Sequence, residues 1–336
     1  MITFIVRRLL GAVLMLLVVS MVTFAVFFLV PRIAGQTTDQ LAAQYVGRNP
    51  SAAQIHATEI KLGLDKPIYE QYGRFLKGIV AGADYNDGPD VSHCPAPCFG
   101  YSFKNQEPVW PQMLGALPVT GSLALGAAII WLVTGVGIGV LSALRRGTVF
   151  DRAAMSVALA GVSLPIFFTA LLSLAIFRDT IPLFPDAATW IPFSTDPGRW
   201  AEALVLPWVT LAFLYAALYA RLTRAGMLDT MNEDFIRTAR AKGLTERQVV
   251  VKHGLRATLT PIVTIFGLDL GLLIGGAVLT ETAFSLPGLG QFAVNAIINQ
   301  DLPEILGVTL LAGFFVVAAN LIVDVLYAVI DPRVRF

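Results

Sequence analysis

Six apolar stretches constrain this chain more than any other feature of its sequence. Each is long enough to cross the hydrocarbon core of a bilayer, about 30 Å thick, at about 1.5 Å per residue. In lipid the backbone amides must bond within their own segment, so the stretches are predicted to be helices. Hydrophobic residues make up 56% of the chain and charged residues 14%, which excludes an ordinary soluble domain. We predict an all-α integral membrane protein with six transmembrane helices, at 9–30, 119–143, 153–177, 204–221, 262–283 and 305–330.

The first apolar stretch lies near the N-terminus and must be distinguished from a cleaved secretion signal. A signal peptide has an apolar core of about 7–15 residues and a small-residue cleavage site. This stretch is longer, and no A-x-A sequence follows it. We predict that residues 1–30 form an uncleaved transmembrane helix. An extracytoplasmic loop region at 31–118 and a core domain with five helices at 119–336 follow.

The positions of Lys and Arg predict the orientation, because short cytoplasmic loops are enriched in these residues. The short loops on the side opposite the termini hold only Arg178 and Arg199, and the loop at 284–304, on that same side, holds neither Lys nor Arg. Both termini and the 222–260 loop are therefore predicted to be cytoplasmic. The supporting residues are Arg7, Arg8, Arg145, Arg146, Arg152, Arg224, Arg237, Arg240, Lys242, Arg247, Lys252, Arg256, Arg333 and Arg335.

The 31–118 region is predicted to contain two helices. Ser51 and Gln54 match a capping box, and Gly63 suits the position that ends the helix. A second helix is expected to start at Pro67, with an apolar stripe that packs on the membrane domain or its headgroup surface, or docks a soluble partner. The stripe consists of Ile68, Tyr72, Phe75, Leu76 and Ile79.

Cys94 and Cys98, the only cysteines, lie in this region as C-P-A-P-C. An oxidising compartment permits a disulfide between them, and the two prolines stiffen a turn that could bring the sulfur atoms together. Free thiols, or a metal bound with the adjacent His93, are the alternatives. We expect the disulfide.

The 227–260 loop carries the signals of two short helices. Asn232 is placed to cap the first helix, acidic residues follow it, and Gly243 suits the left-handed position at its end. Thr245 and Gln248 form a capping box that opens the second helix. From these residues alone, the loop is either a solvated hairpin that follows the positive-inside rule or a site for a partner.

Ala239 and Ala241 keep this turn small, which would suit insertion into a groove. The loop also resembles the signature of ABC-importer permeases. That signature reads E-A-A, three residues, a glycine, nine residues and I-x-L-P. Gly243 and Leu255 match it, whereas R-T-A replaces E-A-A and H-x-L-R replaces the last motif. This form is similar to the dipeptide/oligopeptide (DppB/OppB-like) branch. The resemblance implies an ATPase-coupling site at Arg237, Ala239, Arg240, Ala241, Lys242 and Gly243.

The resemblance covers nearly the whole chain. It includes F-I-V-R-R-L-L near the N-terminus, L-G-L-D-K-P in the outer region, A-L-R-R-G before Asp151, E-T-A-F-S-L-P-G-L-G at 281–290, and D-P-R at 331–333. It implies the ABC importer type I permease fold with a long extracytoplasmic loop after the first helix. Residues 84–98 interrupt the family's G-D-x-G-x-S, so the cysteine pair lies in an insertion.

The sequence contains no recognised motif for catalysis, nucleotide binding or metal binding. The chain lacks G-x-x-x-x-G-K-[ST], so it is not the ATPase, and it lacks H-E-x-x-H and G-x-S-x-G. His56, His93 and His253 are isolated from one another in the sequence. We predict no catalytic residue, metal site or cofactor in this chain, with ATP and Mg bound by partner subunits. A net charge of +1 gives no indication of nucleic-acid binding.

Two acidic residues in the fifth apolar stretch are candidates for the transport pathway, because charge in lipid is costly. Asp269 lies near Gly267, Gly271 and Gly275, which would allow a close helix approach. It either lines the pathway or forms a hydrogen bond with a neighbouring helix, and we favour the hydrogen bond. Glu281 is expected near the outer end of the same span.

The resemblance implies a permease subunit of an ABC importer for peptides in a bacterial or archaeal plasma membrane. It would pair with a second, homologous permease subunit, two ATPase domains and an extracytoplasmic substrate-binding protein. One alternative is an ion-coupled secondary transporter, which would need titratable groups near the midplane and an internal repeat. Others are a membrane scaffold, or an ABC permease for a nickel chelate or glutathione.

Overall fold

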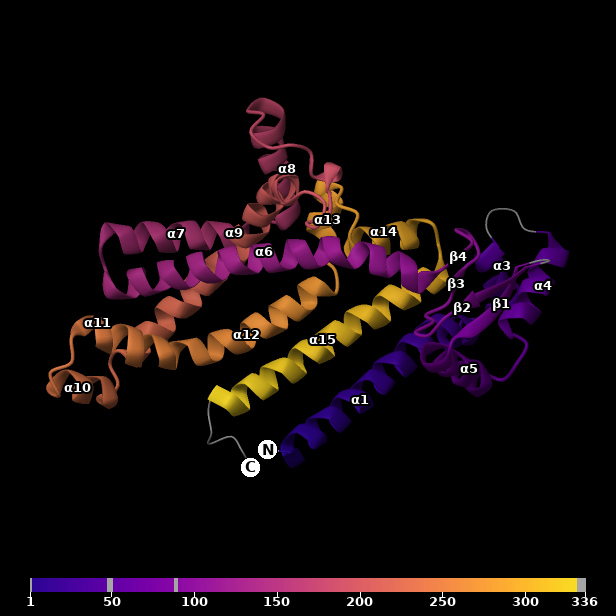
Figure 1. Cartoon of the computed structure of the whole chain (residues 1–336), viewed down its shortest axis with the longest axis horizontal. Coiled ribbons are helices and arrows are strands. Elements are labelled where there is room, and N and C mark those ends of the chain that lie inside the picture. The colour runs from indigo at the N-terminus through magenta and orange to yellow at the C-terminus, as the bar shows by residue number, and fades with distance from the viewer. Residues whose placement is uncertain (1, 47–50, 88–89, 331–336) are drawn as a thin grey trace. The chain divides into compact units, whose positions relative to one another are not determined.

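The structure, a computed structural model, describes residues 2–46, 51–87 and 90–330 (Figure 1). In this part of the chain, five helices are long and apolar enough to cross a membrane. A sixth span results when one bent pair of helices is counted as a single span. The fold is mostly helical, as predicted. Arg333, Arg335 and the D-P-R sequence at 331–333 lie outside the described residues.

The long helices start earlier than the apolar stretches predicted. The fourth, expected from residue 204, begins at Pro197, because the Asp196 carboxylate accepts hydrogen bonds from the backbone N–H groups of Gly198 and Arg199 at 3.0 and 3.1 Å. The long helices are α1 (Ile2–Phe24) with η1 (Ala25–Leu29) and α2 (Val30–Ile33), α6 (Val109–Leu144), α9 (Pro197–Thr230), α11 (Glu246–Gln248) with η4 (Val249–Leu255) and α12 (Arg256–Ile274), and α15 (Leu302–Ile330).

The third predicted span, 153–177, is not one straight helix. It divides into α7 (Val149–Ser163) and α8 (Ile166–Leu174) with η2 (Ala175–Thr180), and the two parts are bent by 102°. Pro165 disfavours helical backbone at the residue before it. Leu164 is accordingly extended, at φ −85° and ψ 131°, and the helix must end there.

The fifth predicted span, 262–283, also ends early. Helix α12 stops at Ile274, and Gly276 has φ +137°, a conformation open mainly to glycine. A separate short helix, α13 (Val278–Phe284), follows. Glu281 therefore does not belong to the helix that carries Asp269, which corrects the prediction.

The described chain forms two compact units: residues 2–118 with 287–318, and residues 119–286 with 319–330. The first unit holds α3 (Thr38–Val46), α4 (Ala52–Leu62), α5 (Ile68–Ala81) and α14 (Leu289–Ile298). It also holds two short antiparallel strand pairs that the sequence did not predict. These are β1 (Ala83–Asp87) with β2 (Asp90–Cys94), and β3 (Tyr101–Ser102) with β4 (Glu107–Pro108).

The two helices predicted in the outer region are present. The Ser51–Gln54 capping box forms and Gly63 is left-handed at φ +66°, as predicted, while Pro67 precedes α5 rather than starting it. On the predicted stripe, the Tyr72 hydroxyl lies 2.8 Å from the Ser20 hydroxyl of α1. Phe24 of α1 contacts the rings of Tyr72 and Phe75. The stripe therefore packs on the first membrane helix.

The second unit is built around α9. Helices α7, α8 and α12 pack against it (Figure 1), together with η3 (Ala187–Thr189). Helix α6 approaches α9 closely at Gly139. A Cβ there would lie 2.5 Å from Thr223 Cβ and 2.7 Å from the Ala220 carbonyl oxygen. Sequence reasoning expected close packing at Gly267 of α12, where a Cβ would overlap Val323, and missed the α6 contact.

Candidate functional site

The polar hairpin, residues 231–255, has the predicted helix–glycine–helix form. Helix α10 (Asp234–Ala241) ends before Gly243, which has φ +78°, and the Thr245–Gln248 capping box opens α11. Asn232 is not the N-cap. That position belongs to Glu233, whereas the Asn232 side chain donates to the Leu228 carbonyl at 2.8 Å, because the preceding helix reaches Thr230.

The polar hairpin has its own small apolar interior. Ile236 and Ala239 of α10 are buried against Val249 of η4, with Met231 packed beside them. Ile236 and Ala239 are three residues apart, so they share one face of the helix. Ala239 therefore packs inside the hairpin. The other five candidate coupling residues are exposed: Arg237, Arg240, Ala241, Lys242 and Gly243.

One ion pair closes the turn of the polar hairpin. The Arg240 guanidinium donates two hydrogen bonds to the Glu246 carboxylate, at 2.7 and 3.1 Å. This contact raises the pKa of Arg240, through the hydrogen bond first and the charge of Glu246 second. Both side chains are exposed, so we expect the pair to contribute less than about 1 kcal/mol. It joins the end of α10 to α11, and through α11 to α12.

Asp269 accepts a hydrogen bond inside the second unit. The Tyr219 hydroxyl of α9 donates to its Oδ2 at 2.8 Å, and the Tyr219 ring packs against Trp131 of α6. Trp131 also stacks on Tyr215. Asp269 thus connects α12 to α9 beside an aromatic cluster. This contact is the hydrogen bond to a neighbouring helix that we favoured over a role in the pathway.

We predict that Asp269→Asn retains the ATP-driven uptake that the family resemblance implies within about tenfold of wild type, because the amide oxygen still accepts the Tyr219 hydrogen bond. Asp269→Leu should be worse. It leaves the buried Tyr219 hydroxyl without its acceptor, a loss of about 1–3 kcal/mol. The uptake per assembled complex, measured in membrane vesicles, tests both variants. A loss well beyond tenfold in Asp269→Asn, with assembly intact, would contradict the hydrogen-bonding role.

Glu281 is fully buried, which sequence reasoning did not anticipate. The Thr120 hydroxyl of α6 donates to Glu281 Oε1 at 2.7 Å. Glu281 therefore ties the short helix α13 to the start of the second unit. Its candidate role in the transport pathway stays a prediction.

Three polar contacts outside the predicted set also hold elements together. Arg224 of α9 pairs with Asp151 of α7 at 2.6 and 2.8 Å. In the first unit, the Ser102 hydroxyl donates to Asp301 at 2.5 Å, and the Asn105 amide donates to Glu304 at 2.6 Å. The sequence D-L-P-E at 301–304 is a signal for the start of α15, where the Asp301 carboxylate accepts a hydrogen bond from the backbone N–H of Glu304, but it does not indicate the partners Ser102 and Asn105.

Cys94 and Cys98 are joined by a disulfide in the structure, with Cα atoms 5.6 Å apart. Both side chains are buried, and Cys94 ends the strand β2. The bridge closes the segment that links the β1–β2 pair to β3.

We predict that mass spectrometry without reduction will find Cys94 and Cys98 in one linked peptide. A Cys94→Ser/Cys98→Ser variant should reach the membrane in normal amounts. Its apolar spans are unchanged, and the short closed segment gives the bridge a local effect. Rapid alkylation of both thiols in the native protein would contradict the bridge.

The comparisons with known proteins agree with this architecture. Residues 135–336 match the family model described as "Binding-protein-dependent transport system inner membrane component", and residues 1–124 match its N-terminal companion. The dipeptide transport system permease protein DppB of Escherichia coli K12 is 34% identical, covering 100% of this chain and 99% of that protein. The di/tripeptide transport system permease protein DppB of Pseudomonas aeruginosa is 35% identical with the same coverage.

A solved structure shares the fold. The MetNI methionine ABC transporter in an inward-facing conformation gives a TM-score of 0.53 at 19% identity. The match covers 66% of this chain and 97% of the other.

Proposed function

This chain belongs to the family of binding-protein-dependent transport system inner membrane components, and from that premise we propose that its cargo is a dipeptide or another short peptide. It is a multi-pass permease subunit of an ABC importer, and ATP hydrolysis takes place on separate subunits. The single observation that supports a peptide as the cargo is the full-length similarity to permeases named for dipeptide and di/tripeptide transport.

The importer works with partner ATPases and a substrate-binding protein. In the assembly that we propose, this chain pairs with a second, homologous permease, two ATPase domains and one binding protein. Both termini and the polar hairpin face the cytoplasm, and residues 31–118 face the outside. The excess of Lys and Arg in the short loops on one side supports this orientation.

The polar hairpin is the part of this chain through which ATPase motion enters. Its second half continues without a break from Glu246 to Ile274, so a displacement of the hairpin moves α12. Asp269, five residues before the end of α12 at Ile274, is hydrogen-bonded to α9. The exposed face at Arg237, Ala241 and Lys242 contacts the ATPase, and ATP-driven closure switches the pathway between its two access states.

Transport by the reconstituted complex tests this function. Proteoliposomes that contain both permeases and the ATPase, supplied with binding protein and ATP, should accumulate labelled glycyl-L-phenylalanine when a protonophore is present. Uptake should stop without ATP or without binding protein. Uptake that continues without ATP and follows an imposed pH gradient would instead indicate an ion-coupled secondary transporter.

A further inference from the structure

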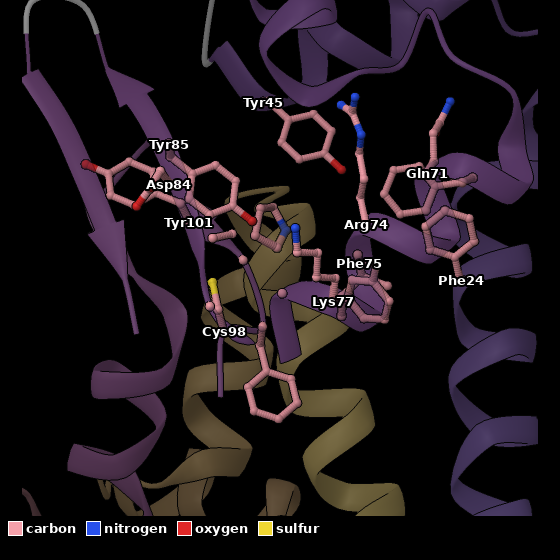
Figure 2. A pocket seen from close by; sticks show the side chains of 18 of the residues that line it. Phe24, Tyr45, Gln71, Arg74, Phe75, Lys77, Asp84, Tyr85, Cys98 and Tyr101 are labelled. Atoms are coloured by element: carbon pink, nitrogen blue, oxygen red, sulfur yellow. The ribbon is translucent and has the colours of Figure 1, made fainter. Parts of the chain in front are cut away.

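A cavity of about 380 Å³ lies within the first unit. It is bounded by α5, by the β1–β2 pair and the segment after it, and by residues at the start of α15 (Figure 2). Its volume falls in the range of about 300–1,000 Å³ that small-molecule sites occupy. None of the candidate coupling or pathway residues lines this cavity.

Two cations on one face of α5 line the cavity. Arg74 and Lys77 are three residues apart and extend from α5 opposite the tyrosine rings of the strands (Figure 2). Arg74 has one contact with Glu70, at 3.5 Å. Lys77 has neither a hydrogen bond nor an ion pair with any described residue. A cation without a partner at the wall of a cavity is suited to bind an anionic group.

Residues outside α5 give the cavity a neutral hydrogen-bond donor and an acid: Tyr45 of α3 and Asp84 of β1. Tyr45 is a buried residue that lines the cavity, and its hydroxyl forms no hydrogen bond within the described part of the chain. Burial, followed by the nearby Tyr85 and Asp301, raises the pKa of Tyr45, so its hydroxyl stays protonated and able to donate. Asp84 lies on β1, and its carboxylate is 2.6 Å from the exposed His93 ring.

Aromatic rings form much of the remaining wall. Phe24 and Phe75 contact each other on one side, and Tyr85 stacks on Tyr101 on the other. Such rings bury apolar side chains, and their faces also attract ammonium groups. The cavity therefore combines two cations, one acid and apolar walls, which complement a zwitterion that carries an apolar side chain.

We propose that this cavity is a subsite for a short peptide on the permease itself, separate from the binding protein. Lys77 and Arg74 bind the peptide's carboxylate, Tyr45 donates a hydrogen bond to it, and Asp84 with the tyrosine faces receives its ammonium group. The inference rests on the proposed function, because it takes the cargo to be a peptide and places residues 31–118 outside.

Photo-cross-linking locates the subsite. The complete transporter, in phosphatidylcholine nanodiscs without ATP or binding protein, is irradiated with glycyl-p-benzoyl-L-phenylalanine and analysed by mass spectrometry. Cross-links should fall on α5, the β1–β2 pair or the start of α15, and glycyl-L-phenylalanine should compete for them. Cross-links confined to the second unit would overturn the proposal.

Variants and a second competitor test the assigned contacts. Lys77→Gln should raise the half-competing concentration of glycyl-L-phenylalanine about tenfold, because it removes a charge-assisted contact. Tyr45→Phe should have a smaller effect in the same direction. Lys66→Gln is the matched control: Lys66 pairs with Glu70 in the same region but does not line the cavity. It should leave competition unchanged.

Glycyl-L-phenylalaninamide, which lacks the carboxylate, should compete about tenfold more weakly in wild type and be insensitive to Lys77→Gln. Equal competition by acid and amide would overturn the carboxylate assignment, as would equal loss in Lys66→Gln. Nanodiscs that contain phosphatidylethanolamine should leave the cross-link in place. If phosphatidylethanolamine abolishes the cross-link and glycyl-L-phenylalanine cannot displace the lipid, the occupant of the cavity is a lipid headgroup. That result would overturn the proposal.

The failure of the subsite and the failure of the peptide function give different results. If wild-type complex with ATP and binding protein takes up no glycyl-L-phenylalanine, the proposed peptide function fails. If uptake is normal but glycyl-L-phenylalanine competes for the cross-link equally well in wild type, Lys77→Gln and Tyr45→Phe, the subsite alone fails.

Discussion

Gly139→Leu is expected to eliminate folded permease from the membrane. A side chain at this position would meet the Ala220 carbonyl oxygen at 2.7 Å and Thr223 Cβ at 2.5 Å. The first of these is backbone on the central helix α9 and has no rotamer by which to move away. Overpacking costs about 1–3 kcal/mol where side chains can yield, and we expect a larger loss here. Helices in lipid depend on such close packing for association.

Gly137→Leu is the matched control, since a Cβ at Gly137 meets nothing within 4 Å. It lies in the same helix, two residues away, and makes the same chemical change. We expect monodisperse protein after detergent extraction to fall more than about tenfold for Gly139→Leu and to stay near wild type for Gly137→Leu. Equal yields of the two variants would show that α6 does not pack on α9 as described.

The membrane fold could be predicted because its main determinants are local. An apolar run long enough to cross the bilayer must be helical, whatever its neighbours are. The capping box at Ser51 and the left-handed glycines at 63 and 243 were also predictable, since each depends on residues within one turn. Asn232 shows the limit: the N-cap moved to Glu233 because α9 extends to Thr230.

Breaks within apolar runs were missed because the hydrophobic signal continues across them. The bend at Leu164 precedes a proline and the break after Ile274 contains two adjacent glycines. Both signals are local, whereas the apolar run that predicts a single span continues across them. Helix pairing is different in kind. The contacts of Asp151 with Arg224 and of Asp269 with Tyr219 join residues 73 and 50 positions apart, which one sequence does not specify.

The candidate coupling residues divide by helical position. The small size of Ala239 and Ala241 suggested that both leave the turn free to enter a groove, yet the structure buries Ala239 and exposes Ala241. Periodicity indicated this division, because Ile236 and Ala239 share a face and Ala241 does not. The two alanines therefore separate the stability of the polar hairpin from its contact with the ATPase.

Ala239→Asp and Ala241→Asp are expected to abolish ATP-driven transport for different reasons. At position 239 the new carboxylate enters the hairpin interior beside Ile236 and Val249, where no cation compensates it among the residues of that cluster. An unpaired buried charge costs several kcal/mol or shifts its pKa to become neutral, so the hairpin should open. At position 241 the carboxylate is solvated, and only the docked ATPase would have to bury it.

Two measurements distinguish these effects. Limited trypsin digestion of the permease in detergent reports the hairpin fold, because Arg237, Arg240 and Lys242 are cleavage sites within it. Co-purification reports ATPase binding. We expect Ala239→Asp to lose both protease protection and ATPase, and Ala241→Asp to keep protection while losing more than about tenfold in ATPase retained. Insertion should be normal in both, since the apolar spans are unchanged. If Ala241→Asp retains the ATPase and transports normally, the exposed face of the polar hairpin does not contact the ATPase.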